Sequence, residues 1–116
     1  MEMTAAVESL SALAHEGRLK VFRMLVTAGP DGLAAGEIAR RLGTPPNTLS
    51  ANLSLLAHAG LAQSRREGRS IIYSARFDRM GELMAFLAED CCGGAAEVCA
   101  PVVAATARSR CASAGA

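Results

Sequence analysis

The sequence predicts a mainly α-helical fold that carries one β-hairpin. Apolar side chains recur at helical spacing through most of the chain before the first cysteine, and alanine, the best helix former, is abundant. Two short runs of alternating residues flank Glu67-Gly68-Arg69, which is typical of a two-stranded hairpin. Hydrophobic residues make up 51% of the 116 residues, enough for one small core.

Two helices are expected first. The first covers residues 4–14, with Thr4 as its candidate N-cap. Its apolar side comprises Val7, Leu10, Leu13 and Ala14. The second covers residues 16–28, and its apolar stripe comprises Leu19, Phe22, Leu25 and Val26. The run Gly29-Pro30-Asp31-Gly32 then predicts a turn.

A short helix, a tight turn and a longer helix come next. The short helix covers residues 36–42 and ends at Gly43. Thr44 is expected to cap the longer helix, which has two prolines in its first turn. This helix runs to about Ala59 and stops at Gly60. Its inward residues are Leu49, Leu53 and Leu56.

A hairpin and a last helix complete the prediction. Residues 61–66 and 70–76 are the expected strands, and Asp78 is expected to cap the helix that follows. The apolar side of that helix comprises Met80, Leu83, Met84 and Leu87. A short helix, a turn, a longer helix and a two-stranded wing together make a winged helix-turn-helix. We therefore expect residues 1–92 to form this domain, and residues 93–116 to form a tail that contributes a thiol ligand.

The longer helix and the wing carry groups suited to double-stranded DNA. If the leucines face inward, short polar side chains occupy the opposite face and can approach base edges and phosphates. These residues are Asn47, Thr48, Ser50, Ala51, Asn52 and Ser54. Asn52 is suited to a bidentate bond with adenine. The wing arginines, which can meet backbone phosphate or a minor groove, are Arg65, Arg66 and Arg69. The alternative is an ordinary solvated face, but the order of the elements favours DNA binding.

Charge is unevenly distributed, although the net charge is only +1. Between Ile38 and Arg79 there are seven arginines and two acidic residues, a balance that suits a polyanion. Between Met80 and Cys99 there are four acidic residues and no basic one, which suits a cation. Aromatic residues make up only 3% of the chain, which argues against binding single strands by base stacking.

The four cysteines are Cys91, Cys92, Cys99 and Cys111. The first residues lack the basic segment of a secretory signal, and no apolar run approaches a membrane span. We therefore expect a cytoplasmic protein with free thiols.

The adjacent residues Cys91 and Cys92 can bind the same ion only where the helix ends and the backbone can bend, and Gly93-Gly94 supplies that freedom. The stretch from Cys92 to Cys99 is long enough to bring a third sulfur to the same ion.

Three thiolates without histidine suit a soft, thiol-seeking centre. Trivalent arsenic or antimony fits a three-sulfur pocket, because a lone pair occupies the remaining position. Zinc prefers a fourth ligand, for which the candidates are Cys111, Glu89 and Asp90. Otherwise Cys111 is expected to be a bystander, and all four cysteines are alternatively small buried or incidental residues. His15 and His58 lie at helix ends, where a capping or packing role is expected.

Residues 10–87 resemble the ArsR/SmtB family of metal-responsive winged-helix repressors. The resemblance rests on a series of short motifs in order and spacing: the run from Leu13 through His15-Glu16-Gly17-Arg18 to Leu25, Gly36-Glu37-Ile38-Ala39-Arg40-Arg41-Leu42-Gly43, Leu49-Ser50-Ala51-Asn52-Leu53, Leu56-Ala57-His58-Ala59-Gly60-Leu61, Arg66-Glu67-Gly68-Arg69, and Tyr73. It implies operator binding by a homodimer whose interface is formed by the first and last helices. The family usually has histidine where this chain has Asn52, which bears on the operator sequence.

The cysteines are similar to those of an arsenic-responsive subgroup, which carries a vicinal pair at the end of the last helix and a third cysteine shortly after. The resemblance implies that Cys91, Cys92 and Cys99 bind arsenite, the inducer that releases the repressor from DNA. Other signals stay open: antimonite, methylated arsenicals, cadmium, lead, zinc or thiol oxidation. A metal carrier would not need the wing arginines. A thiol or arsenate reductase is not expected, because the chain has no Cys-x-x-Cys motif and no Cys-x5-Arg loop.

Overall fold

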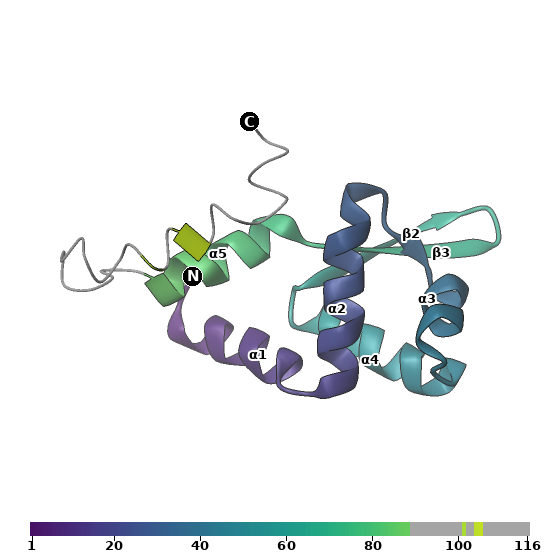
Figure 1. Cartoon of the computed structure of the whole chain (residues 1–116), viewed down its shortest axis with the longest axis horizontal. Coiled ribbons are helices and arrows are strands. Elements are labelled where there is room, and N and C mark those ends of the chain that lie inside the picture. Colours follow the sequence, from purple (N-terminus) through teal and green to yellow (C-terminus); the bar gives the residue numbers. More distant parts are fainter. Residues whose placement is uncertain (89–100, 102–103, 106–116) are drawn as a thin grey trace. The chain divides into compact units, whose positions relative to one another are not determined.

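The structure, a computed structural model, describes residues 1–88, 101 and 104–105 of the chain (Figure 1). Met1–Met84 form one compact unit, and the residues from Ala85 onward belong to a second. The elements in order are α1 (Met3–Leu13), α2 (Glu16–Ala28), a 3-10 turn (Gly29–Asp31), β1 (Leu33–Ala34), α3 (Ala35–Leu42), α4 (Pro46–His58), β2 (Ala62–Glu67), β3 (Ser70–Ala75) and α5 (Phe77–Ala88). The predicted fold class, a mainly helical winged helix-turn-helix, is confirmed.

The wing is the outer part of an antiparallel sheet with the strand order β1-β3-β2. Strands β2 and β3 form the predicted hairpin, and Gly68 turns the chain with a φ of 61°. The short strand β1 was not predicted, since two residues are too few to show an alternating pattern. It pairs with Tyr73 and Ile72 of β3. A Cβ at Gly32 would collide with the carbonyl oxygen of Tyr73, so glycine permits this close approach.

The core of the first unit lies among α2, α3, α4 and the start of β2. Its fully buried side chains include Leu25, Ile38, Leu53, Leu56 and Leu61. The predicted inward residues of α4 are therefore confirmed, and Leu49 is buried as well. Because helical residues three and four apart share a face, this leucine row fixes which side of α4 remains outside.

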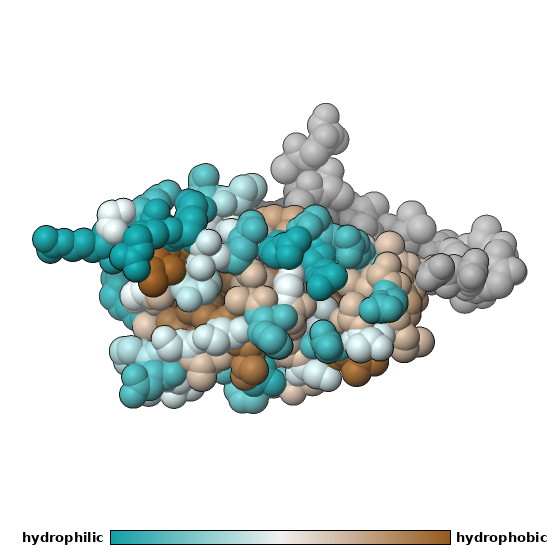
Figure 2. Space-filling model, turned by 180° about the vertical axis from the view of Figure 1, so that it is seen from behind, coloured by the Kyte–Doolittle hydropathy of each residue, from teal (hydrophilic) through white to brown (hydrophobic). Residues whose placement is uncertain are grey.

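The predicted apolar side of α1 is not the side that the structure buries. The structure buries Ala6, Ser9 and Ala12, whereas Val7 is 53% exposed and Leu10 is 41% exposed. Small side chains let α1 approach the neighbouring helices closely, and the larger apolar residues remain outside. Leu19, which belongs to the predicted apolar stripe of α2, is also exposed. Figure 2 shows hydrophobic patches that interrupt the hydrophilic surface of one face.

Three helix caps in the structure differ from those predicted from the sequence. Glu2 precedes α1, so Thr4 lies within the helix. Pro45 is the N-cap of α4, so Thr44 lies outside it, and Asp78 lies in the first turn of α5 rather than before it. Proline at the first helical position already has the required φ, which explains the start of α4 at Pro46.

The expectation for His15 is confirmed, because its side chain caps α2. The Nδ1 atom accepts a hydrogen bond from the backbone N–H of Arg18 at 3.2 Å. Arg18 in turn donates from Nε to the carbonyl oxygen of Ala12 at 2.6 Å, which joins α2 to the end of α1. Among the residues that the structure describes, no helix is long and apolar enough to cross a membrane.

Candidate nucleic-acid interface

The outer face of α4 presents short polar side chains to solvent. The exposed positions are Asn47, Thr48, Ser50, Ala51 and Ser54. Short side chains let the backbone of a helix lie close to a DNA groove, and hydroxyl and amide groups can bond base edges or phosphates. This face has the chemistry of a recognition helix.

Asn52 was expected on that outer face, and this was wrong. Its side chain is only 6% exposed. A Cβ at Gly17 would lie 3.3 Å from the Asn52 Nδ2 atom and 3.1 Å from the His15 Cε1 atom, so both side chains lie close to Gly17 in the first turn of α2. The burial of Asn52 could have been predicted from the sequence, because Asn52 lies three residues after Leu49 and four before Leu56, on the same face as both.

The register of the wing separates two neighbouring arginines. Arg65 pairs with Ile72 and Arg66 with Ile71, and consecutive strand residues point to opposite faces. Arg65 donates from Nη2 to the carbonyl oxygen of Asp31 at 2.7 Å. It also donates from Nε to Glu67 Oε1 at 2.9 Å. Arg65 therefore fastens the hairpin to the turn before β1.

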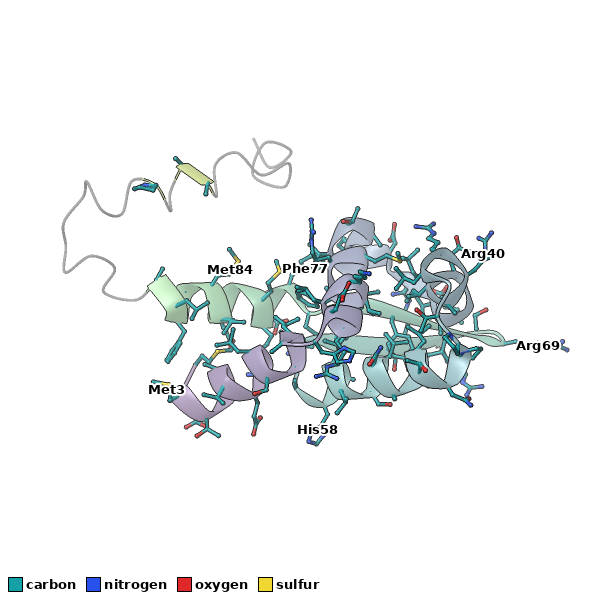
Figure 3. The ribbon with its side chains drawn as sticks, turned by 60° about the horizontal axis from the view of Figure 1, so that its bottom comes forward. Met3, Arg40, His58, Arg69, Phe77 and Met84 are labelled. Carbon is teal, nitrogen blue, oxygen red and sulfur yellow. The ribbon has the colours of Figure 1, made fainter. Side chains whose placement is uncertain are left out.

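Arg66 and Arg69 remain available for another partner. Both are exposed, and neither forms a hydrogen bond or ion pair with the part of the chain that the structure describes. Figure 3 shows Arg69 at the far end of the hairpin. Two cations on a projecting wing have the charge and the reach for backbone phosphate or a minor groove.

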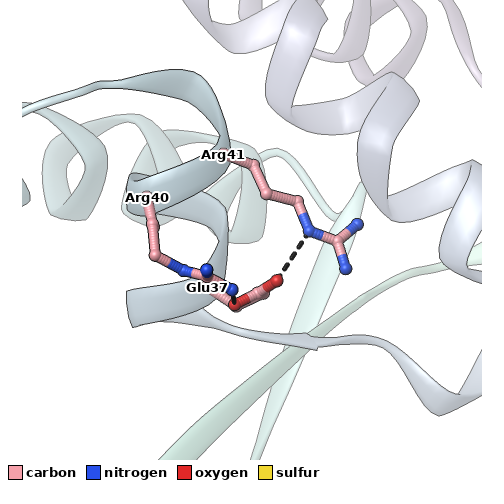
Figure 4. A network of polar contacts seen from close by, with 3 residues as sticks. All are labelled: Glu37, Arg40 and Arg41. Carbon is pink, nitrogen blue, oxygen red and sulfur yellow. Dashed lines mark hydrogen bonds and ion pairs between the residues drawn. The ribbon is translucent and has the colours of Figure 1, made fainter.

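Two further arginines, on α3, share one carboxylate. Glu37 accepts a hydrogen bond from Arg40 and another from Arg41 at 2.8 Å (Figure 4). These hydrogen bonds hold the pKa of Glu37 below its ordinary value. The ion pairs are exposed and screened by solvent, so they contribute little to stability. Their main effect is to offset the positive charge of α3 beside α4.

The predicted thiol ligands Cys91, Cys92 and Cys99 lie outside the described residues, as do Cys111, Glu89 and Asp90. Within residues 1–88, 101 and 104–105, no group of three His, Cys, Asp or Glu side chains is arranged to hold a metal ion. His58 ends α4 with an exposed side chain. The ligand assignment therefore stays a prediction from the sequence.

Comparison with known proteins agrees with this geometry. Residues 13–65 match the model of a helix-turn-helix domain family. The HTH-type transcriptional regulator YgaV of Escherichia coli is 33% identical over 86 residues, which are 74% of this chain and 83% of that protein. The homodimeric winged helix-turn-helix DNA-binding domain Mb0332 of Mycobacterium bovis superimposes with a TM-score of 0.61 at 30% identity, covering 76% of this chain and 82% of that one.

The chain belongs to the ArsR family of winged helix-turn-helix transcriptional regulators. An ArsR-like transcriptional regulator from Rhodococcus sp. RHA1 superimposes with a TM-score of 0.65 at 25% identity, covering 72% of this chain and 76% of that one. The relatives are DNA-binding regulators, so this member of the ArsR family is not an enzyme. Within the family fold, α4 occupies the place of the recognition helix and β2–β3 that of the wing.

Proposed function

We propose that this ArsR-family protein is a homodimeric repressor that binds operator DNA when free and releases it on binding trivalent arsenic. One observation carries the choice of inducer: the vicinal pair Cys91-Cys92 and a nearby third thiol, Cys99, follow directly on the last helix. The described part of α5 runs to Ala88, shortly before the pair. An inducer held there acts on a helix that belongs to the DNA-binding fold.

The chemistry of arsenite matches three thiols. Each As–OH group is exchanged for an As–S bond, and the thiol proton leaves with the hydroxide as water. Three cysteines thus bind one arsenic atom and release three waters, with no change of oxidation state. Soft thiolate ligands favour such a centre over a hard cation, and zinc would need a fourth ligand. Antimonite has the same bonding pattern, and a methylated arsenical would use two thiols.

The DNA contacts follow from the exposed groups. On α4, the residues proposed to meet DNA are Asn47, Thr48, Ser50 and Ser54. On the wing, Arg66 and Arg69 are proposed to meet phosphate or a minor groove, since each is exposed and Arg65 is engaged with the protein. Phosphate contacts give salt-dependent affinity, and base contacts from α4 give the sequence preference.

The exposed apolar residues of α1 support the dimer. Met3 is 66% exposed, and Val7 and Leu10 lie on the same helix with large exposed fractions. Met84 of α5 is 50% exposed. Apolar surface of this kind marks a protein interface, and the similar Mb0332 domain is homodimeric. Two recognition helices must match successive major grooves, so an inducer that favours another dimer geometry weakens DNA binding.

Fluorescence anisotropy of the reduced protein tests the proposal. The probe is the duplex upstream of its own gene, and the titrants are arsenite and, separately, zinc. We expect arsenite alone to weaken operator binding, by up to about a hundredfold for a coupling free energy of roughly 1–3 kcal/mol. Cys99→Ser should abolish the response, and the matched Cys111→Ser variant should retain it. DNA binding that is insensitive to arsenite would overturn the proposed inducer and direct attention to oxidants or other metals.

A further inference from the structure

The start of α5 and the residue before it lie against the two residues that follow the end of α4, Gly60 and Leu61. The backbone N–H of Arg76 donates to the carbonyl oxygen of Leu61 at 2.8 Å. One turn later, the guanidinium of Arg79 lies over Gly60: a Cβ at Gly60 would be 2.7 Å from both Nε and Nη2 of Arg79. Side-chain carbons do not approach other atoms so closely, so the absence of a side chain at Gly60 makes room for this guanidinium.

Arg79 is held there with few hydrogen bonds. Its Nε atom is buried and has no hydrogen-bond partner among the described residues. Its Nη1 atom lies 3.7 Å from Glu82 Oε2, a loose and partly exposed ion pair on the same helix. A buried N–H without an acceptor is unfavourable, so the packing of α5 on the Gly60 corner maintains this arrangement.

The end of α4 is a favourable place for a cation. The last carbonyl groups of a helix lack intrahelical donors and carry partial negative charge. Gly60 and Leu61 are themselves buried, and the N–H of Leu61 donates to the carbonyl oxygen of Leu56 within α4 at 3.0 Å. Gly60 and Leu61 thus connect the guanidinium of Arg79 to the last turn of α4.

We infer that Arg79 is a positioning residue that couples the last helix to the recognition helix. In this account, binding of the inducer to the thiols beyond α5 moves α5. The contact between the guanidinium of Arg79 and Gly60 then changes, and the end of α4 shifts. This inference rests on the proposed function, because it takes the cysteines that follow α5 as the inducer site. It assigns the coupling to one side chain rather than to α5 as a whole.

Arg79→Gln tests the inference, with Arg76→Gln as the matched control. Both variants remove one arginine from the start of α5. The side chain of Arg76 pairs with Asp78 at 2.8 Å, and only its backbone contacts Leu61, so Arg76→Gln leaves the Gly60 corner intact. Operator affinity is measured by anisotropy with and without arsenite. We expect the arsenite-induced loss to fall from as much as about a hundredfold to below tenfold in Arg79→Gln, and to stay at the wild-type value in Arg76→Gln.

Amide hydrogen exchange of the inducer-free protein supplies a second readout. Arg79→Gln should speed exchange of the Ala59, Gly60 and Leu61 amides by about tenfold or more, while Arg76→Gln leaves them unchanged. Unchanged exchange in Arg79→Gln would overturn the inference. So would faster exchange with a full arsenite response, since Arg79 would then only stabilise the corner.

If arsenite has no effect on the wild type, the proposed inducer fails, and exchange alone decides whether Arg79 holds the end of α4. Should Arg79→Gln not fold, Arg79→Lys replaces it, because lysine keeps the charge and loses the planar fork. The same two readouts then apply, with the same expected and contradicting results.

Discussion

Asn52 lies among the leucines on the inner side of α4, where an amide has few water molecules to bond. Across the helix interface, its side chain lies close to Gly17 of α2. A polar side chain at such a place fixes how two helices meet, because it must be accommodated by particular partners. The identity of residue 52 therefore matters first for the placement of α4 on α2, and only through that placement for DNA.

Exchanging Asn52 and Ser50 for alanine separates these roles. Asn52→Ala should lower the free energy of unfolding by about 1–2 kcal/mol, because it removes the packing of a buried side chain against α2. Ser50→Ala should change stability by less than about 0.5 kcal/mol and weaken operator binding, since Ser50 is exposed. Urea unfolding and operator titration measure the two effects. A stable Asn52→Ala protein with altered operator preference would show that Asn52 reads bases after all.

At the scale of elements, the wing contains one arginine that bonds to the protein and two exposed arginines that we propose contact DNA. Arg66→Gln should make the slope of log affinity against log salt less steep by about 0.9, the value for one lost phosphate contact. Its melting temperature should not change. Arg65→Gln should instead destabilise the wing, because Arg65 bonds Asp31 and Glu67. If Arg65→Gln and Arg66→Gln reduced the salt dependence of DNA binding equally, the two arginines would not have these different roles.

The N-terminal turn of α5 predicts a dependence of stability on pH. The hydrogen bond from Arg76 is the main cause that holds the pKa of Asp78 below its ordinary value. A carboxyl whose pKa is lowered on folding stabilises the fold above its unfolded pKa, near 4, and loses this effect as the pH falls through its folded value. Asp78→Asn should therefore be less stable than the wild type at neutral pH, and the gap should close below about pH 4.

Urea unfolding between about pH 7 and pH 3 checks this expectation. Arg76→Gln removes the same hydrogen bond from the other partner, so it should show the same closing gap. A gap that is independent of pH would mean that Asp78 acts by something other than its charge.

The sequence predicted most elements because local patterns determine them. The row Leu49, Leu53 and Leu56 identified the buried side of α4, and glycine at the hairpin identified its turn. Strand β1 was not predicted from the sequence, because its two residues form a strand only by pairing with β3. At the candidate site, the exposure of Asn47, Thr48, Ser50 and Ser54 followed from the leucine row, whereas Asn52 was expected outside and is buried. The engagement of Arg65 with Asp31 depends on residues far apart in the sequence.

For the whole molecule, an apolar helical stripe does not say whether its partner is in the same chain or in another. Val7 and Leu10 form a good stripe, yet the chain buries Ala6, Ser9 and Ala12 in their place. The large apolar side chains of α1 are thus left at the surface. We propose that they are buried in the homodimer, in which case monomer stability and dimerisation depend on different sides of the same helix.

The variant Val7→Asp tests whether the exposed apolar residues of α1 form the dimer interface. A buried charge at the interface should oppose association, whereas the core side of α1 is untouched. We expect a folded monomer by light scattering, and operator affinity lower by about a hundredfold or more, because two linked recognition helices bind much more tightly than one. Leu19→Asp is the matched control, since Leu19 is an exposed leucine of α2, 43% accessible, and should leave the dimer intact. A dimeric Val7→Asp protein, or equal dissociation of both variants, would place the interface elsewhere.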